Sequence, residues 1–294
     1  MASHMPSKPI AYLMALCVFV LAACERTIDF PLPFEGEELV VLARFDPTSV
    51  MAVEVSRTAP ALADSVPWVT DATVAVYESD TLLEILPYVG EGLYRSALDH
   101  RPVANASYQL RVYASDDSVF SAKVVMPEQP QVERIEALHS HYVTADGTAH
   151  LLRIQLGDGE AEERFYSLNV YADAPGNIRL GVNYDFFLPY EADCNPAGGL
   201  FTQRCIQESG RPIELPIQAS YFDRRTDTLR SIDTTWVWLT AYDEATYTYS
   251  QAMRNPAGDF DRVFSPPTAL PNFMTGGYGI LAVQHTQKFE AILE

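Results

Sequence analysis

Short apolar runs that alternate with polar residues recur along the chain from residue 39 onward, with turn signals between them. A period of two residues is typical of β-strands that bury one face, so the pattern predicts an all-β protein. Seven of these runs precede residue 127, at 39–43, 52–56, 72–77, 81–86, 93–95, 108–113 and 119–125. They predict one β-sandwich domain over residues 36–127.

The strand near residue 108 carries a more specific signal. The segment from Leu98 to Val112 resembles the tyrosine corner of immunoglobulin-like and fibronectin-like sandwiches, because Tyr108 opens a strand that continues at alternate positions with Leu110 and Val112. We therefore expect an N-terminal immunoglobulin/fibronectin-like sandwich.

A second β-rich domain is expected over residues 131–294. Pro127 and Pro130 break the strand pattern, since proline cannot donate to a β-ladder. Asp146-Gly147 predicts a type I′ turn within a hairpin, and Asp243 is suited to cap one short helix that reaches Arg254. The expected strands of this domain are 135–144, 149–156, 165–171, 178–187, 231–242 and 278–284.

The first residues of the chain read as an export signal. Met1–Met5 resemble a cloning remnant, and the apolar run from Ile10 to Ala23 is too short for a transmembrane helix but suits a signal peptide over residues 1–23. The Leu-Ala-Ala-Cys sequence that ends at Cys24 resembles a bacterial lipobox, so we expect Cys24 to be the acylated mature N-terminus. Residues 24–35 would form an extended tether. The alternative is an ordinary secretory peptide followed by an incidental cysteine.

Composition and charge narrow the range of partners. With 48% hydrophobic and 20% charged residues, the chain has the composition of a folded protein. The 39 acidic residues outnumber the 20 basic ones and give a net charge of −19. This balance argues against nucleic acid as a partner, because phosphate binding needs several basic side chains on one face.

Two cysteines remain once Cys17 leaves with the signal peptide and Cys24 is acylated. We expect Cys194 and Cys205 to form a disulfide in an oxidising envelope. The alternative is a redox-active dithiol, which the spacing disfavours because it is not Cys-x-x-Cys.

Three of the histidines fall within the expected hairpin. If Asp146 and Gly147 form a two-residue loop, His150 lies opposite Val143, on the same face as His139 and His141. Three imidazoles could then hold Zn or Cu. That face also carries Ile135, Ala137, Leu152, Ile154 and Leu156, however, so we expect core or interface histidines and no metal site.

Aromatic residues gather in the long segment 184–206, which the expected disulfide would close. Exposed aromatic side chains on long loops mark contact surfaces, so we expect Tyr184, Phe187, Tyr190 and Phe201 to contact a ligand or partner. The alternative is that Tyr184, Phe186 and Tyr190 lie on the buried face of a strand, which leaves only Phe187 and Phe201 as contact residues. No nucleophile elbow, zincin helix, phosphate loop or dinucleotide fingerprint occurs in the chain, so we expect neither an enzyme nor a cofactor.

Several short motifs together resemble a known family. The motifs are Cys24–Asp29, Leu39–Val41, Val53–Pro60, Val69–Val74, Tyr247–Tyr249 and Pro271–Ile280. In this order they resemble a family of uncharacterised outer-membrane lipoproteins of Bacteroidota, whose domain has no known function and which are often encoded beside TonB-dependent receptors. Residues 187–231 match no pattern of that family. In the last motif, we expect Asn272, Gly276, Gly277 and Gly279 to form a turn with close backbone packing.

The resemblance implies an accessory role in nutrient uptake. The chain would be a non-enzymatic lipoprotein of the outer membrane, on the surface or periplasmic side, that binds or docks for a TonB-dependent transporter. It supplies no catalytic residues. A structural or adhesive surface lipoprotein is the alternative, and an envelope hydrolase with an active site built from distant residues is a third hypothesis.

Overall fold

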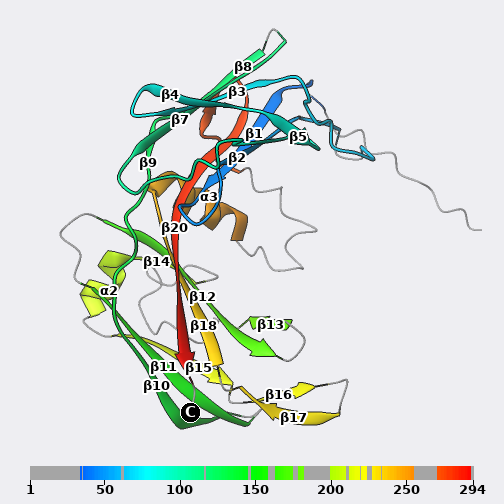
Figure 1. The fold of residues 1–294 in the computed structure, drawn as a ribbon. Coiled ribbons are helices and arrows are strands. Elements are labelled where there is room, and N and C mark those ends of the chain that lie inside the picture. The colour runs from blue at the N-terminus through cyan, green and yellow to red at the C-terminus, as the bar shows by residue number, and fades with distance from the viewer. Residues whose placement is uncertain are drawn as a thin grey trace, which may run out of the picture. The chain divides into compact units, whose positions relative to one another are not determined.

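A computed structural model describes most of the chain after the expected tether. The described residues are 34, 36–60, 63–115, 117–144, 147–157, 163–174, 178–181, 199–209, 212–218, 220–223, 227–232, 234–254 and 270–292. The contacts divide the chain into one unit of residues 1–35 and 60–63 and a second unit of residues 36–59 and 64–294. Every strand and helix given below belongs to the second unit, and strands dominate, which confirms the all-β prediction (Figure 1).

The first part of the second unit is a β-sandwich. One layer contains β1 (Leu39–Phe45), β2 (Ala52–Arg57), β5 (Tyr88–Gly90) and β6 (Leu93–Arg95), which belong to a nine-stranded sheet. The other is a six-stranded sheet of β3 (Thr73–Glu78), β4 (Thr81–Leu86), β7 (Ser107–Ala114), β8 (Asp117–Ser121), β9 (Val124–Val125) and β19 (Met274–Thr275). Six expected runs correspond to β1–β4, β6 and β7, and the run 119–125 covers parts of β8 and β9.

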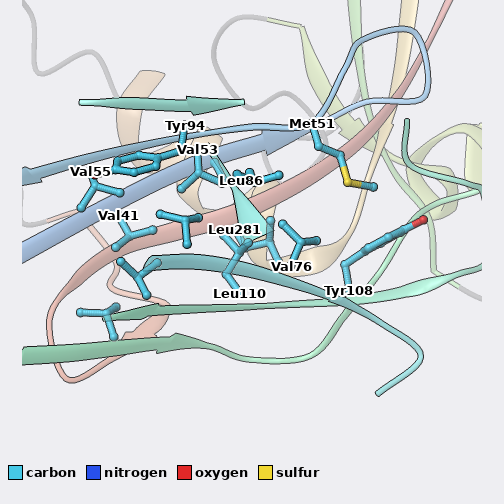
Figure 2. Packing of buried hydrophobic residues seen from close by; sticks show 14 of the residues in the cluster. Val41, Met51, Val53, Val55, Val76, Leu86, Tyr94, Tyr108, Leu110 and Leu281 are labelled. Carbon is cyan, nitrogen blue, oxygen red and sulfur yellow. The ribbon is translucent and has the colours of Figure 1, made fainter. Parts of the chain in front are cut away.

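Alternation along the strands builds the first core, the buried cluster between these two layers. Figure 2 shows Val41 and Val53 from one layer meeting Val76 and Leu110 from the other, and all four side chains are fully buried. Their neighbours in sequence point away from this core, as Glu54 does beside Val53. The sequence forms strands here because every second residue is apolar.

The tyrosine corner is confirmed in its geometry. Tyr108 is fully buried, and its hydroxyl accepts a hydrogen bond from the backbone N–H of Val103 at 2.9 Å. The same hydroxyl donates to the Glu78 carboxylate at 2.6 Å. A bond from the hydroxyl to the backbone a few residues upstream is the signature of such corners. Burial and the bond to Glu78 raise the pKa of Tyr108.

The second part has its own buried cluster, the second core. Its strands include the three-stranded sheet of β10 (Val132–Thr144), β11 (Gly147–Leu156) and β15 (Ile213–Gln218). Facing strands are β12 (Phe165–Ala174), β13 (Ile178–Gly181), β14 (Leu200–Thr202) and β18 (Thr234–Tyr242), which belong to the nine-stranded sheet. The remaining elements are β16 (Ser220–Asp223), β17 (Thr228–Ser231), α2 (Gln203–Ser209) and α3 (Glu244–Arg254).

Strand β20 (Tyr278–Ile292) contributes to both cores. Its first half pairs in parallel with β1, and its second half pairs antiparallel with β18 (Figure 1). Leu281 and Val283 lie in the first core, whereas Ala291 lies in the second. Residues 274–283 thus contribute to the first core, although they lie within the expected second domain of residues 131–294. The division into these two domains stays a prediction.

The register of the β10–β11 hairpin differs from the prediction. Thr144 pairs with Gly147 and Val143 with Thr148, so Gly147 belongs to a strand and not to a two-residue loop with Asp146. A further irregularity between Leu138 and Tyr142 adds residues on β10, as a β-bulge does. His150 therefore does not pair with Val143 of β10. On the other edge of β11, His150 pairs with Ile217 of β15.

The expected helix is confirmed as α3. The Asp243 side chain accepts a hydrogen bond from the backbone N–H of Thr246 at 3.0 Å, which is the geometry of an N-cap. Burial raises the pKa of Asp243, although the bonds from Thr246 oppose that effect. No helix in the described ranges combines the length and apolarity that a membrane crossing requires.

Candidate functional site

The motif at residues 271–280 is a turn fastened by one side chain. Asn272 Oδ1 accepts hydrogen bonds from the backbone N–H groups of Met274 and Gly279, at 3.1 and 3.0 Å. Its Nδ2 donates to the carbonyl oxygens of Met274 and Gly277. Asn272 therefore uses its polar atoms to hold the chain as it turns from β19 into β20.

The glycines of this motif are required by close backbone packing. Gly279 has a φ of +128°, and a Cβ atom there would lie 1.8 Å from the carbonyl oxygen of Val41. A Cβ on Gly277 would lie 2.5 Å from the carbonyl oxygen of Leu39. A side chain at either position would push β20 away from β1. The expected structural role of these residues is thus confirmed.

An open polar groove of about 520 Å³ lies beside this turn. Glu37, Glu38, Asp117 and Tyr278 contribute to its walls together with Asn272. Asp117 is paired with Arg57, whose Nη1 lies 2.8 Å from Oδ2. The groove is acidic. Asn272 in its wall uses its polar atoms for hydrogen bonds to the backbone.

Comparison with known protein families identifies the family of the chain. A family model described as a domain of unknown function (DUF4249) matches residues 25–290. The chain belongs to this family. No curated protein matches the sequence. The DUF4249 match covers both cores and the turn at Asn272, so both parts belong to one family domain.

The predicted aromatic contact residues fall into two groups. Tyr184, Phe187 and Tyr190 lie outside the described residues, and their role stays a prediction. Phe201 is described, and its expected exposure is wrong. It is only 2% exposed in β14, where its ring lies 5.5 Å from that of Tyr166 inside the second core. Pairing of β14 with β12 turns this aromatic residue inward.

The expected disulfide and histidine cluster are covered only in part. Cys205 is buried in α2, whereas Cys194 lies outside the described residues, so their bond stays a prediction. The side chains of His139 and His141 also lie outside the described set, and His150 is half-buried. Within the described ranges, no group of three His, Cys, Asp or Glu side chains could hold a metal ion.

A cluster of aromatic and charged side chains lies on the nine-stranded sheet, on the face opposite the second core. The strand registers place two rows side by side: Tyr171, Trp236 and Glu290 in one, and Asn169, Trp238 and Lys288 in the other. Core residues such as Val170, Val237 and Leu239 alternate with them and point inward. We call these six residues the aromatic surface.

Ring contacts hold the aromatic surface together. The rings of Tyr171 and Trp238 lie 4.9 Å apart at an angle of 59°, and Lys288 Nζ lies 4.2 Å from the centre of the Trp238 ring. Such a cation–π contact is stronger where water is excluded. Both tryptophans and Tyr171 are half-buried, and Lys288 is exposed. The arrangement can offer flat apolar rings bordered by an amide, an ammonium and a carboxylate.

Sequence reasoning placed residues 231–242 on a strand but missed this surface. The alternation of Trp236 and Trp238 with Thr235 and Val237 already implies one aromatic face. What the sequence could not supply is the pairing that brings Tyr171 of β12 and Lys288 of β20 to that face.

No pattern in the sequence marks Asp46 as a buried carboxylate. Asp46 is 5% exposed and accepts hydrogen bonds from Thr48 Oγ1 at 2.7 Å and Gln284 Nε2 at 3.1 Å. Burial alone would raise the pKa of Asp46, but these bonds and one from Thr286 outweigh burial and lower it. The carboxylate is thus a satisfied structural group that joins the end of β1 to β20.

Proposed function

We propose that the chain is a non-enzymatic lipoprotein of the outer membrane that acts as an accessory binding or docking component of a TonB-dependent transporter. The lipobox-like sequence before Cys24 supports the anchor. The resemblance described above supports the transporter as partner. The single observation that carries the docking role is the aromatic surface.

The aromatic surface has the composition of a protein-binding hot spot. Trp and Tyr dominate the binding energy of protein interfaces, because they bury large rigid rings and keep one polar group at the rim. Here two of the chain's three tryptophans lie on neighbouring rows of one sheet face. The surrounding polar groups, Asn169, Lys288 and Glu290, provide the rim that specific interfaces use for orientation.

Contacts within the sheet prepare this surface for binding. The ring of Trp238 contacts both the Tyr171 ring and Lys288 Nζ, so less side-chain freedom is lost when a partner covers it. Rigid sheet positions also fix the distance between rings better than a loop would. These features support docking against a preformed surface of another protein.

The test is capture of partners from native membranes. The acylated, tagged protein is purified in mild detergent, and co-purifying proteins are identified by mass spectrometry. We expect a stoichiometric TonB-dependent barrel with the wild type and its loss with the double variant Trp236→Ser/Trp238→Ser. Truncation of hot-spot residues costs about 2 kcal/mol or more each, which corresponds to at least ~30-fold in Kd.

A matched control uses an exposed aromatic residue of the other part. Tyr113 is 42% exposed on β7, and Tyr113→Ser should leave the capture unchanged. If no barrel is captured with the acylated wild type, the transporter role fails and an adhesive role is tested next. If the barrel is captured equally well with the double variant, the aromatic surface is not the docking site.

A further inference from the structure

A row of four side chains, with an exposed aromatic residue at each end, crosses the outer face of the first part. Val40 of β1 pairs with Tyr278 of β20 on one side and with Ser56 of β2 on the other, and Ser56 forms a bridge with Trp68. Directly opposed residues share one face of a sheet. Tyr278, Val40, Ser56 and Trp68 therefore form a continuous row, which we call the tether-end row.

The tether-end row points away from the first core. Val41 and Val55, the sequence neighbours of Val40 and Ser56, are fully buried in that core. Trp68 and Tyr278 are 41% and 44% exposed at the two ends of the row. Neighbouring strands lie about 4.8 Å apart, so the row is about 14 Å long.

Trp68 is held in position by the backbone below it. A Cβ atom on Gly92 would lie 2.5 Å from Cε3 of Trp68, which shows how closely the ring lies against this glycine. The backbone N–H of Val69 donates to the carbonyl oxygen of Val55, which fixes the segment on β2. The indole ring is thus fixed by its surroundings while much of its surface is in contact with solvent.

The row lies where the chain enters the fold. The Thr58 hydroxyl donates to the carbonyl oxygen of Gly36 at 2.7 Å and accepts from the backbone N–H of Glu38 at 2.9 Å. These bonds hold residues 36–38 against the end of β2, within two residues of Val40 and Ser56. Gly36 lies twelve positions after Cys24, so a chain anchored at Cys24 places Gly36 at most about 40 Å from the lipid.

We propose that the tether-end row is a membrane-docking surface that lays Trp68 and Tyr278 into the lipid headgroup region of the anchoring leaflet. This inference rests on the proposed anchor at Cys24. Amphipathic rings of Trp and Tyr concentrate at the boundary between hydrocarbon and headgroups. The short reach of the tether keeps the row at a high effective concentration near lipid, so a weak contact suffices.

Charge favours neutral lipid over a second copy of the chain as the occupant. Glu37 and Glu38 beside the row are exposed acids, and the full sequence carries a net charge of −19. Two such surfaces would repel each other, and so would the row and a strongly anionic bilayer. Docking should therefore be stronger on zwitterionic vesicles than on vesicles rich in anionic lipid.

Quenching by brominated lipids tests this contact. The acylated full-length mature protein is reconstituted into zwitterionic vesicles, with Trp236→Phe and Trp238→Phe leaving Trp68 as the reporter. We expect a loss of Trp68 emission in vesicles with brominated acyl chains and none in unbrominated ones. The matched control carries Trp68→Phe and Trp236→Phe, and its remaining Trp238 should keep its emission. Unfolding midpoints establish that both reporters are folded.

A third variant distinguishes docking of the tether-end row on lipid from mere nearness of Trp68 to the membrane. Tyr278→Ser in the Trp68 reporter should reduce the quenching, because the row loses one of its two rings. Unchanged quenching in that variant, or equal emission of Trp68 in both kinds of vesicle, overturns the inference. Flotation with the vesicles and the mass of the Cys24 peptide test the anchor separately. An acylated, floating protein without Trp68 quenching refutes the row alone, and an unacylated protein refutes both proposals.

Discussion

Replacing Gly279 by alanine should separate β20 from β1 and destabilise the protein far more than an ordinary glycine substitution. The new Cβ atom would lie 1.8 Å from the carbonyl oxygen of Val41, whereas ordinary contact begins near 3.4 Å. The strands must therefore move apart by more than 1 Å, roughly the scale at which a backbone hydrogen bond is lost. Six residue pairs join β1 to the first half of β20, so this movement affects most of that ladder.

Gly90 provides the matched control for this prediction. Its φ of +129° is almost that of Gly279, but a Cβ atom there meets nothing within 4 Å. Gly90→Ala should therefore lower the free energy of unfolding only by the cost of holding alanine at this positive φ, about 1 to 3 kcal/mol. Gly279→Ala adds the clash and several weakened hydrogen bonds at about 1 kcal/mol each, so we expect an excess of about 2 to 4 kcal/mol.

Urea unfolding of the soluble mature chain with Cys24→Ser measures both costs, from the shift of the midpoint at a constant slope. If Gly279→Ala fails to fold while Gly90→Ala folds, the result also agrees with the prediction, because it shows the larger loss of stability in Gly279→Ala. Equal losses of stability in the two variants would show that β20 can move away from β1 freely, and would refute the assignment of this glycine to close packing.

Three further predictions concern single side chains. Tyr108→Phe removes the partner of the Val103 N–H and of Glu78, and should cost about 1 to 3 kcal/mol in urea unfolding. The folded pKa of Asp46 is lowered, so its contribution is complete above its ordinary pKa of 3.8 and disappears as the pH falls through the folded value. The stability difference between wild type and Asp46→Asn should therefore shrink below about pH 4, and a constant difference would contradict this. Asp243→Ala should cost about 1 kcal/mol in the same assay, whereas Asp243→Asn, which can still cap α3, should cost much less.

The strands of the first part could be predicted because their burial alternates. Every second residue of β1 and β7 is apolar and buried, and this period is visible without knowledge of the partners. Strand β20 was predicted to end near residue 284, because the sequence then becomes polar through Gln287 and loses the alternation. The strand continues because its backbone pairs with β18, which no local pattern reveals.

The candidate sites depended on pairings that a sequence does not contain. Phe201 belongs to a strand of three residues, too short to show which face is buried. The expected position of His150 required a register that both the loop and the irregularity after Leu138 change. The aromatic surface combines residues from three strands up to 121 positions apart, from Asn169 to Glu290.

The contribution of β20 to both cores has a consequence for how the protein folds. During synthesis, or during the export proposed above, β1 emerges long before β20, because Val40 and its partner Tyr278 are 238 positions apart. Until then, the edge of β1 that β20 covers has no partner from β20, and such edges promote aggregation. Folding should therefore be slow and assisted by holding chaperones, and an expression fragment that stops at residue 127 should be insoluble or associate through β1.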